Sequence, residues 1–265
     1  MSNREIVVKV DGLVKTFSSR SGKEKVNAVK NVSLEVQKGR TLGLVGESGS
    51  GKSTVARCIT GLLKSDSGQV VVLGRDISQE SAKQMRSFRQ DLQIVFQEPL
   101  ESLDPRYQIG KSIAEPLKLH TKLNKDEITS RVELLMKQVS LSKDLINRFP
   151  HQLSGGQQQR VNIARALATN PKVVILDEPT ASLDVSVQLE ILELLIKLQK
   201  EFDLTYILIS HNLATVRAVC DTVAVMYLGE IIEEGDTDEI FNSPKNSYTK
   251  SLLGSYLPVD PREKV

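Results

Sequence analysis

A glycine-rich loop of the form GxxxxGK[ST] constrains this chain more than any other feature of its sequence. Its three glycines allow a tight turn in which successive backbone N–H groups point inward at one anion. The lysine supplies a point charge for the β- and γ-phosphates, and the hydroxyl of the next residue suits a Mg²⁺ ion. The loop therefore predicts a nucleotide site. The residues expected to line it are Gly46, Glu47, Ser48, Gly49, Ser50, Gly51, Lys52, Ser53 and Thr54.

The segments on either side of this loop support the interpretation. Residues 41–45 form an apolar run that is typical of a buried strand, and a helix is expected to begin at Lys52. Such a helix aims its positive dipole end at the phosphates. We expect it to continue through residues 55–63 and to end at the turn residues 65–68. The alternative, a glycine-rich turn without function, does not explain this strand–loop–helix order.

Composition narrows the class of protein only slightly. The chain has 265 residues, of which 40% are hydrophobic, so it can bury a substantial core. Lys plus Arg number 35 against 33 acidic residues, and a net charge of +2 gives no argument for a nucleic-acid partner. Cys58 and Cys220 are the only cysteines and are expected to be small core residues. No apolar run approaches the roughly 18 residues of a membrane span, so we expect the chain neither to enter nor to span a membrane by itself.

Hydrophobic periodicity predicts an α/β fold. The pattern indicates a parallel-sheet core with a small antiparallel sheet on its N-terminal side and a helical insertion. With the phosphate loop, this arrangement resembles the P-loop NTPase (RecA-like) fold, with an N-terminal antiparallel β subdomain and an inserted α-helical subdomain. The inserted helical region is expected at residues 109–149, and two short tail helices near Asp238 and Tyr248. The expected strands are residues 5–10 (turned at 11–12), 26–36, 69–73 (turned at 74–76), 92–96, 173–176, 205–209, 222–227 and 230–233, and residues 257–261 are expected to be extended.

Polar side chains follow three of the predicted core strands. Gln97 ends one strand, Asp177 and Glu178 end the next, and His211 follows a third. Ligands of open α/β sheets gather at the carboxyl ends of strands. Adjacent strand residues point opposite ways, so Asp177 suits a Mg²⁺ contact and Glu178 suits polarising the attacking water. For His211 we expect a γ-phosphate contact, although a buried structural histidine is the alternative, as an ordinary strand end is for Gln97.

A second predicted helix also begins with glycine residues. Ser154, Gly155, Gly156 and Gln157 open a helix whose free N–H groups could receive a phosphate, or could simply form a flexible N-cap. Further along, Asp184 precedes a helix with an apolar stripe.

Together these residues resemble the nucleotide-binding subunits of ABC transporters along nearly the whole chain. The resemblance rests on the phosphate loop, Gln97, the signature at residues 153–157, Asp177 with Glu178, the Asp184 loop and His211. It implies ATP and Mg²⁺ as cofactors, with Ser53, Gln97 and Asp177 as metal contacts. It also implies that Glu178, His211 and Gln97 are catalytic. Phe17 looks like the aromatic that stacks on adenine, although the family usually has Tyr there and a core aromatic is the alternative.

The resemblance also implies a division of the chain. The ABC ATPase domain would cover residues 5–260, with residues 236–265 as a C-terminal tail. Within it, residues 5–98 and 160–235 would form the nucleotide-binding core with its antiparallel part. Residues 99–159 would form the helical subdomain.

Closer features look like the peptide and nickel uptake branch of the family. They are residues 95–99, 102–106, 113–117 and 243–249. That branch implies a second ABC ATPase subunit as partner (a heterodimer, or a homodimer), two membrane permease subunits and an extracellular substrate-binding protein. The location would be peripheral, at the cytoplasmic face of a bacterial or archaeal plasma membrane. The cysteine-rich cluster of some members is lacking, as in the shorter second-ATPase type.

In this family two cassettes dimerise head to tail, so Ser154, Gly155 and Gly156 would serve the partner's nucleotide. Residues 98–106 are expected to line the groove for a cytoplasmic helix of the membrane subunit. Substituting Leu103 or Arg106 is expected to leave nucleotide binding intact but to uncouple ATP hydrolysis from uptake. Two other functions stay open. One is a soluble ABC ATPase that remodels a complex without transport, and the other is a regulatory module that does not hydrolyse ATP.

Overall fold

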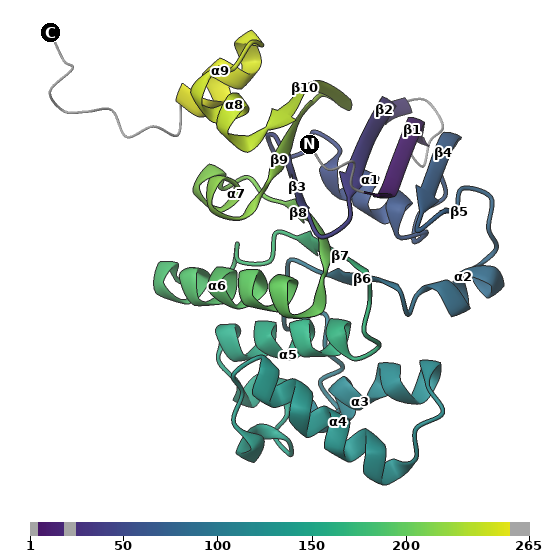
Figure 1. Cartoon of the computed structure of the whole chain (residues 1–265), viewed down its shortest axis with the longest axis vertical. Coiled ribbons are helices and arrows are strands. Elements are labelled where there is room, and N and C mark those ends of the chain that lie inside the picture. Colours follow the sequence, from purple (N-terminus) through teal and green to yellow (C-terminus); the bar gives the residue numbers. More distant parts are fainter. Residues whose placement is uncertain (1–4, 19–24, 255–265) are drawn as a thin grey trace, which may run out of the picture.

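Two β-sheets form the framework of the computed structural model, which describes residues 5–18 and 25–254. A six-stranded sheet has the order β10-β9-β3-β8-β7-β6, in which β3 and β6 to β9 are parallel and β10 is antiparallel. A four-stranded antiparallel sheet has the order β2-β1-β4-β5 (Figure 1). The strands are β1 (Ile6–Ser18), β2 (Lys25–Gln37), β3 (Thr41–Val45), β4 (Ser67–Val72), β5 (Arg75–Asp76), β6 (Leu92–Val95), β7 (Val173–Asp177), β8 (Thr205–Ile209), β9 (Thr222–Tyr227) and β10 (Glu230–Asp236).

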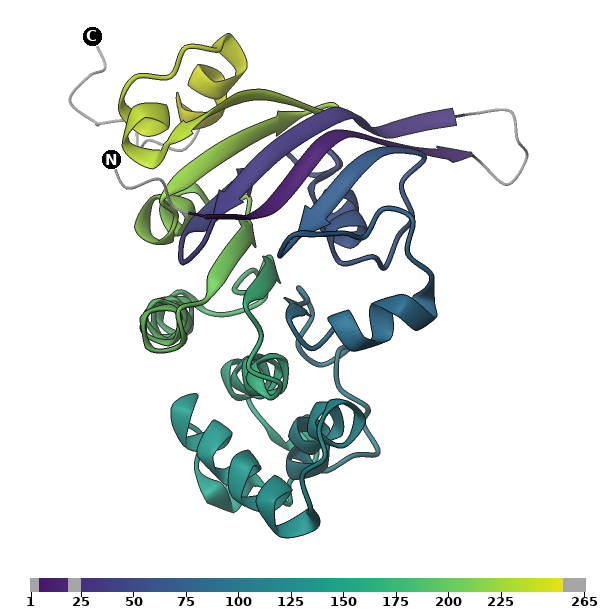
Figure 2. The same cartoon turned by 45° about the vertical axis from the view of Figure 1, so that its right-hand side comes forward.

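Helices cover the six-stranded sheet and extend away from it. Helices α3 and α4 occupy the end of the molecule farthest from the four-stranded sheet (Figure 2). The helices are α1 (Lys52–Ile59), α2 (Ala82–Phe88), α3 (Ile109–His120), α4 (Lys125–Gln138), α5 (Gly155–Leu167), α6 (Val185–Phe202), α7 (Leu213–Val219), α8 (Thr237–Asn242) and α9 (Ser247–Gly254), with short 3₁₀ helices at Lys143–Leu145 and Pro150–Gln152.

The core strands are apolar on both faces because each face has its own partner. All residues of β3, β7 and β8 are buried. In β7, Val174 and Leu176 pack into a cluster with helices α3 to α6, whereas Val173 and Ile175 pack into a second cluster with α1 and the four-stranded sheet. Strand residues alternate between faces, so these continuous apolar runs are the expected signature of a buried parallel sheet. The predicted α/β core, antiparallel sheet and inserted helices are confirmed.

The N-terminal strands differ from the prediction. The expected turn at residues 11–12 is a bulge inside the continuous strand β1, where Gly12 adopts a φ of +58°. In β2, Asn31 has a φ of +53°, which breaks the alternation of faces. Val29 is therefore buried, while Val26, expected on the buried face, is 62% exposed. Bulges of this kind change which face a side chain occupies without ending the strand.

Three local boundaries also differ. The turn after β4 lies at Leu73 and Gly74, both with positive φ, and residues 75–76 pair with β4 as strand β5. Helix α1 ends at Ile59, earlier than expected, because Gly61 turns the chain with a φ of +64°. Helix α2 was not predicted, although Ser81 caps it in a capping box with the residue three positions later.

The remaining predictions about the helices and cysteines are confirmed. Helices α3 and α4 fill the helical region, and α8 and α9 lie where two tail helices were expected. Cys58 and Cys220 are buried and carry free thiols. The extended stretch predicted at residues 257–261 lies outside the described residues. Among the helices that the structure describes, none combines the length and apolar character needed to cross a bilayer.

Candidate nucleotide site

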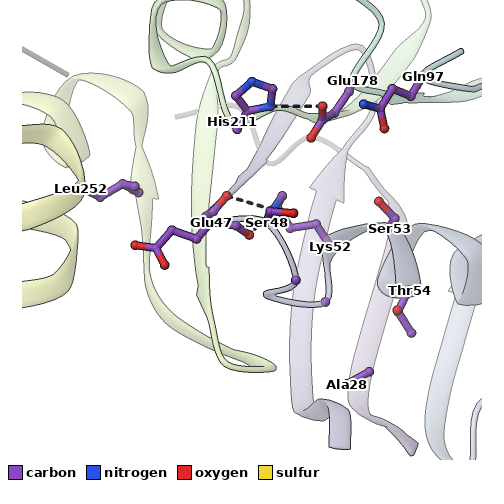
Figure 3. A pocket seen from close by; sticks show the side chains of 13 residues that line it. Ala28, Glu47, Ser48, Lys52, Ser53, Thr54, Gln97, Glu178, His211 and Leu252 are labelled. Atoms are coloured by element: carbon purple, nitrogen blue, oxygen red, sulfur yellow. Dashed lines mark hydrogen bonds and ion pairs between the residues drawn. The ribbon is translucent and has the colours of Figure 1, made fainter. Parts of the chain in front are cut away.

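A cavity of about 730 Å³ opens at the carboxyl ends of the core strands. Its volume is within the range of small-molecule sites. Figure 3 shows residues from distant parts of the chain around it. Its lining consists of Ala28, Gly46, Glu47, Ser48, Gly49, Gly51, Lys52, Ser53, Thr54, Gln97, Glu178, His211 and Leu252.

The phosphate loop needs glycine at two of its positions for steric reasons. A Cβ atom on Gly46 would lie 2.1 Å from the carbonyl oxygen of Met226, and one on Gly51 would lie 2.2 Å from that of Ala28. Both residues also have positive φ, at 148° and 109°. The loop is thus pressed against strands β2 and β9, and only glycine fits these two contacts.

Lys52 is buried beneath this loop. Its Nζ donates hydrogen bonds to the carbonyl oxygens of Gly46 (2.8 Å) and Glu47 (2.7 Å) and to the hydroxyl of Ser50 (3.2 Å). Burial lowers the pKa of Lys52, and the nearby carboxylates of Glu178 and Asp177 oppose that shift. The ammonium group is therefore held at the centre of the loop, where a phosphate would accept its hydrogen bonds.

Ser53 lines the cavity and contacts Asp177, a predicted site residue that does not itself belong to the lining. The Ser53 hydroxyl donates a hydrogen bond to Oδ1 of Asp177 at 3.2 Å. Burial raises the pKa of the Asp177 carboxyl, and the bond from Ser53 opposes that shift. A hydroxyl, a carboxylate and the amide oxygen of nearby Gln97 are the hard oxygen donors that Mg²⁺ takes. These side chains fit a magnesium ion.

Glu178 turns away from its neighbour Asp177. Its φ of +47° marks the point where the chain leaves β7, and its backbone N–H donates to the Ile209 carbonyl of β8 at 2.9 Å. Oε2 of its side chain lies 3.1 Å from Nδ1 of His211 (Figure 3). The two adjacent acids therefore have different partners, and the structure brings Gln97, Glu178 and His211 to one cavity wall.

The predicted signature residues lie elsewhere. Ser154 and Gln157 form a capping box at the start of α5, with N···O distances of 3.0 and 3.3 Å. Gly156 allows α5 to approach α6, because a Cβ there would lie 2.5 Å from Cγ1 of Val187. Neither these residues, nor Gly155, nor Asp184 line the cavity. Ser154, Gly155 and Asp184 are exposed at the surface.

Phe17 also lies outside the lining of the cavity. It is 42% exposed on β1, where Nζ of Lys15 lies 5.7 Å from its ring centroid. Two lining residues were not predicted from the sequence, namely Ala28 of β2 and Leu252 of α9. Neither belongs to a motif, and no local pattern marks them.

Comparisons with known proteins agree with this geometry. The family model described as "ABC transporter" matches residues 29–181. The oligopeptide transport ATP-binding protein OppF of Haemophilus influenzae is 45% identical, over 98% of this chain and 81% of its own length. The oligopeptide transport ATP-binding protein OppD of Mycobacterium tuberculosis is 44% identical, over 100% of this chain and 44% of its own length.

Solved structures give the same result. The ATP-binding cassette MJ0796, in a dimeric post-hydrolysis state with ADP and Pi, has a TM-score of 0.80 and 32% identity over 87% of this chain and 98% of that one. CbiO1 from Clostridium perfringens, part of the transporter complex cbiONQ, has a TM-score of 0.79 and 33% identity over 91% and 92% of the two chains. The chain belongs to the ABC transporter family, as an ATP-binding subunit with the P-loop NTPase fold. It is an ATPase, and ATP is its nucleotide.

Proposed function

We propose that this chain powers an ABC importer of oligopeptides or dipeptides, with nickel or metal-chelate complexes as the alternative cargo. The observation that carries the proposal is the single cavity shared by the phosphate loop, Gln97, Glu178 and His211. The relatives named for oligopeptide transport support the cargo class. Co-purification of the native complex tests this assignment, which requires membrane permease subunits to accompany the chain.

In the proposed mechanism each side chain has a separate task. Lys52 and the loop N–H groups hold the β- and γ-phosphates and stabilise charge as the phosphoryl group transfers. Glu178 positions and polarises the attacking water, and His211 contacts the γ-phosphate while holding the Glu178 carboxylate. Ser53, Asp177 and Gln97 would hold Mg²⁺, which supplies positive charge to the phosphate oxygens when bound.

We further propose a composite site formed by two cassettes arranged head to tail. The signature residues Ser154 to Gln157 are absent from their own cavity lining, which suits a role at a partner's nucleotide. Next to Asp184, the apolar side chains of Val185 and Leu189 are 73% and 60% exposed, and large exposed apolar residues of this kind suit an interface. The partner is a second ABC ATPase, in a heterodimer or a homodimer.

The rest of the proposed assembly is inferred from the resemblance of this chain to the peptide and nickel uptake branch. Two permease subunits and an extracellular binding protein complete it, and the chain lies peripherally at the cytoplasmic face of the membrane. We retain the division into a core (residues 5–98 and 160–235), a helical subdomain (99–159) and a tail (236–265) as part of this proposal.

Phe17→Ala is expected to weaken ATP binding by about 1–2 kcal/mol through lost stacking on the adenine base. The proposal rests on the exposed position of the ring on β1, close to the end of the strand. Nucleotide titration of the folded variant provides the test. An unchanged dissociation constant would leave Phe17 as a surface aromatic of the four-stranded sheet.

The segment after Gln97 is hydrogen-bonded to α5, the helix that begins at the signature residues. Nδ2 of Asn162 donates to the Pro99 carbonyl at 2.9 Å, and Nη1 of Arg165 donates to the Ser102 carbonyl at 2.5 Å. Both donors belong to α5. A shift of Gln97 on hydrolysis would therefore reach α5 and the helical region through these bonds.

The side chain of Leu103 is 3% exposed and packs in the core, so a substitution there would act on coupling through the packing of this segment. Arg106 is exposed and pairs with Asp104 at 2.7 Å. Arg106→Ala is expected to leave ATP binding by the isolated chain unchanged but to uncouple hydrolysis from uptake in the complex. Cysteines at the exposed positions 100, 101, 105 and 106 should cross-link to a permease subunit, and one at position 64 should not. Cross-linking from position 64 alone would refute the coupling role.

A further inference from the structure

Helix α9 forms a wall of the nucleotide cavity. Leu252, from the second half of the helix, belongs to the cavity lining. Figure 3 shows it on the side of the cavity where Glu47 lies. The helix comes from the tail of the chain, far in sequence from every motif that binds the nucleotide. Its position beside the cavity therefore raises the question of what it contributes to the phosphate loop.

Tyr248 connects this helix to the loop directly. Its hydroxyl oxygen accepts a hydrogen bond from the backbone N–H of Glu47 at 3.4 Å. Partial burial raises the pKa of this hydroxyl above its ordinary value, so the group is protonated at neutral pH. The ring packs on Tyr227, the last residue of β9, with centroids 4.2 Å apart and planes inclined by 38°.

The start of α9 is itself fixed to the sheet. The carboxylate of Glu233 on β10 accepts hydrogen bonds from the backbone N–H groups of Lys245 (2.6 Å) and Asn246 (3.1 Å). The side chain of Asn246 then accepts one from the N–H of Tyr248 at 2.8 Å. At the other end of the helix, Leu253 is buried in the core. The position of Tyr248 is thus fixed both by the hydrogen bond of its backbone N–H and by the packing of its ring.

Both backbone polar groups of Glu47 are hydrogen-bonded. Its N–H is bonded by Tyr248, and its carbonyl accepts the bond from Nζ of Lys52. We propose that Tyr248 is a positioning residue. It holds residues 46–48 of the phosphate loop in the conformation that receives the triphosphate. Preorganisation of this kind lowers the cost of ordering the loop when the ligand binds. Within the described part of the chain, the hydrogen bonds and ring contact of Tyr248 are with Glu47, Asn246 and Tyr227 and not with Glu178 or His211, so we expect the effect to act on nucleotide affinity.

Tyr248→Phe tests the inference by removing one hydroxyl while keeping the stacked ring. We expect the full chain to bind a non-hydrolysable ATP analogue about 3- to 10-fold more weakly, the range of one hydrogen bond. In the assembled complex, KM for ATP should rise by a similar factor, and kcat should stay within about 2-fold. Tyr227→Phe is the matched control, since it removes a hydroxyl from the same ring pair, and it should bind like the parent chain.

Glu233→Ala provides an independent route to the same effect, because it frees the start of α9 without altering Tyr248. It should weaken nucleotide binding as Tyr248→Phe does, and the double variant should be no weaker than the worse single one. The inference rests on the assignment of this cavity to the nucleotide, and failure of the unmodified chain to bind the analogue would refute that assignment instead. If the unmodified chain binds, an unchanged dissociation constant in Tyr248→Phe, an equal loss in Tyr227→Phe, or a loss confined to kcat overturns the positioning role.

Discussion

Glu178→Gln is expected to lower ATP turnover about 10²-fold or more while ATP binding is retained. The substitution keeps the size and polarity of the side chain but removes the carboxylate that polarises water, and positioned general bases contribute about 10²- to 10⁴-fold. It also replaces the carboxylate that lies 3.1 Å from Nδ1 of His211 by a neutral amide, which weakens the attraction between the two side chains. With hydrolysis blocked, the variant should accumulate as an ATP-bound dimer with its partner cassette. Steady-state phosphate release and size-exclusion chromatography with ATP measure the two effects.

Glu193→Gln is the matched control for that experiment. Glu193 is an exposed glutamate on α6 that does not line the cavity. It undergoes the same chemical change, so its turnover should equal that of the parent chain. Near-normal hydrolysis by Glu178→Gln in the reconstituted complex would contradict the role assigned to Glu178.

Lys52→Ala is expected to weaken ATP binding about 10- to 100-fold, which corresponds to the 1.5–3 kcal/mol of hydrogen bonds to a charged group. The change removes the positive charge beneath the phosphates. It also removes the hydrogen bonds that Nζ donates to Gly46, Glu47 and Ser50, so the loop loses its internal brace. Isothermal titration with ATP gives the affinity, and a thermal melt shows whether the fold is kept.

Lys64→Ala controls for the loss of a lysine near the same helix. Lys64 is exposed after the end of α1 and does not line the cavity. Its affinity for ATP should match that of the parent chain. Equal affinities for Lys52→Ala and Lys64→Ala would contradict the assignment of Lys52 to the phosphates.

The parts of the site that sequence predicts are those with local chemistry. The phosphate loop must be glycine-rich wherever it occurs, and the polar residues Gln97, Glu178 and His211 each follow an apolar strand. Parallel strands bring their carboxyl ends to one sheet edge, so the position of these side chains in the chain largely determines their position in space. The continuous apolar runs of β7 and β8 predicted their burial for the same reason.

The parts that sequence misses depend on tertiary contacts. Tyr248 and Glu47 are separated by 201 residues, and the local sequence around neither residue predicts their contact. Leu252 resembles any apolar residue of a short helix, although it lines the cavity. The errors in β1 and β2 have a different origin, because positive φ at Gly12 and Asn31 shifts the alternation of faces that the prediction used.

The most direct test of the proposed function is ATP-driven oligopeptide transport by the complex purified through this chain and placed in proteoliposomes. Hydrolysis and movement of a labelled oligopeptide are measured together, with the extracellular binding protein supplied on its own side of the membrane. We expect both activities to require ATP, to rise with peptide, and to be lost in the Glu178→Gln complex. Hydrolysis without any peptide movement would contradict the assignment of oligopeptides as the cargo. Purification of the native chain with no permease subunit would contradict the importer assignment and favour an ATPase that remodels another complex.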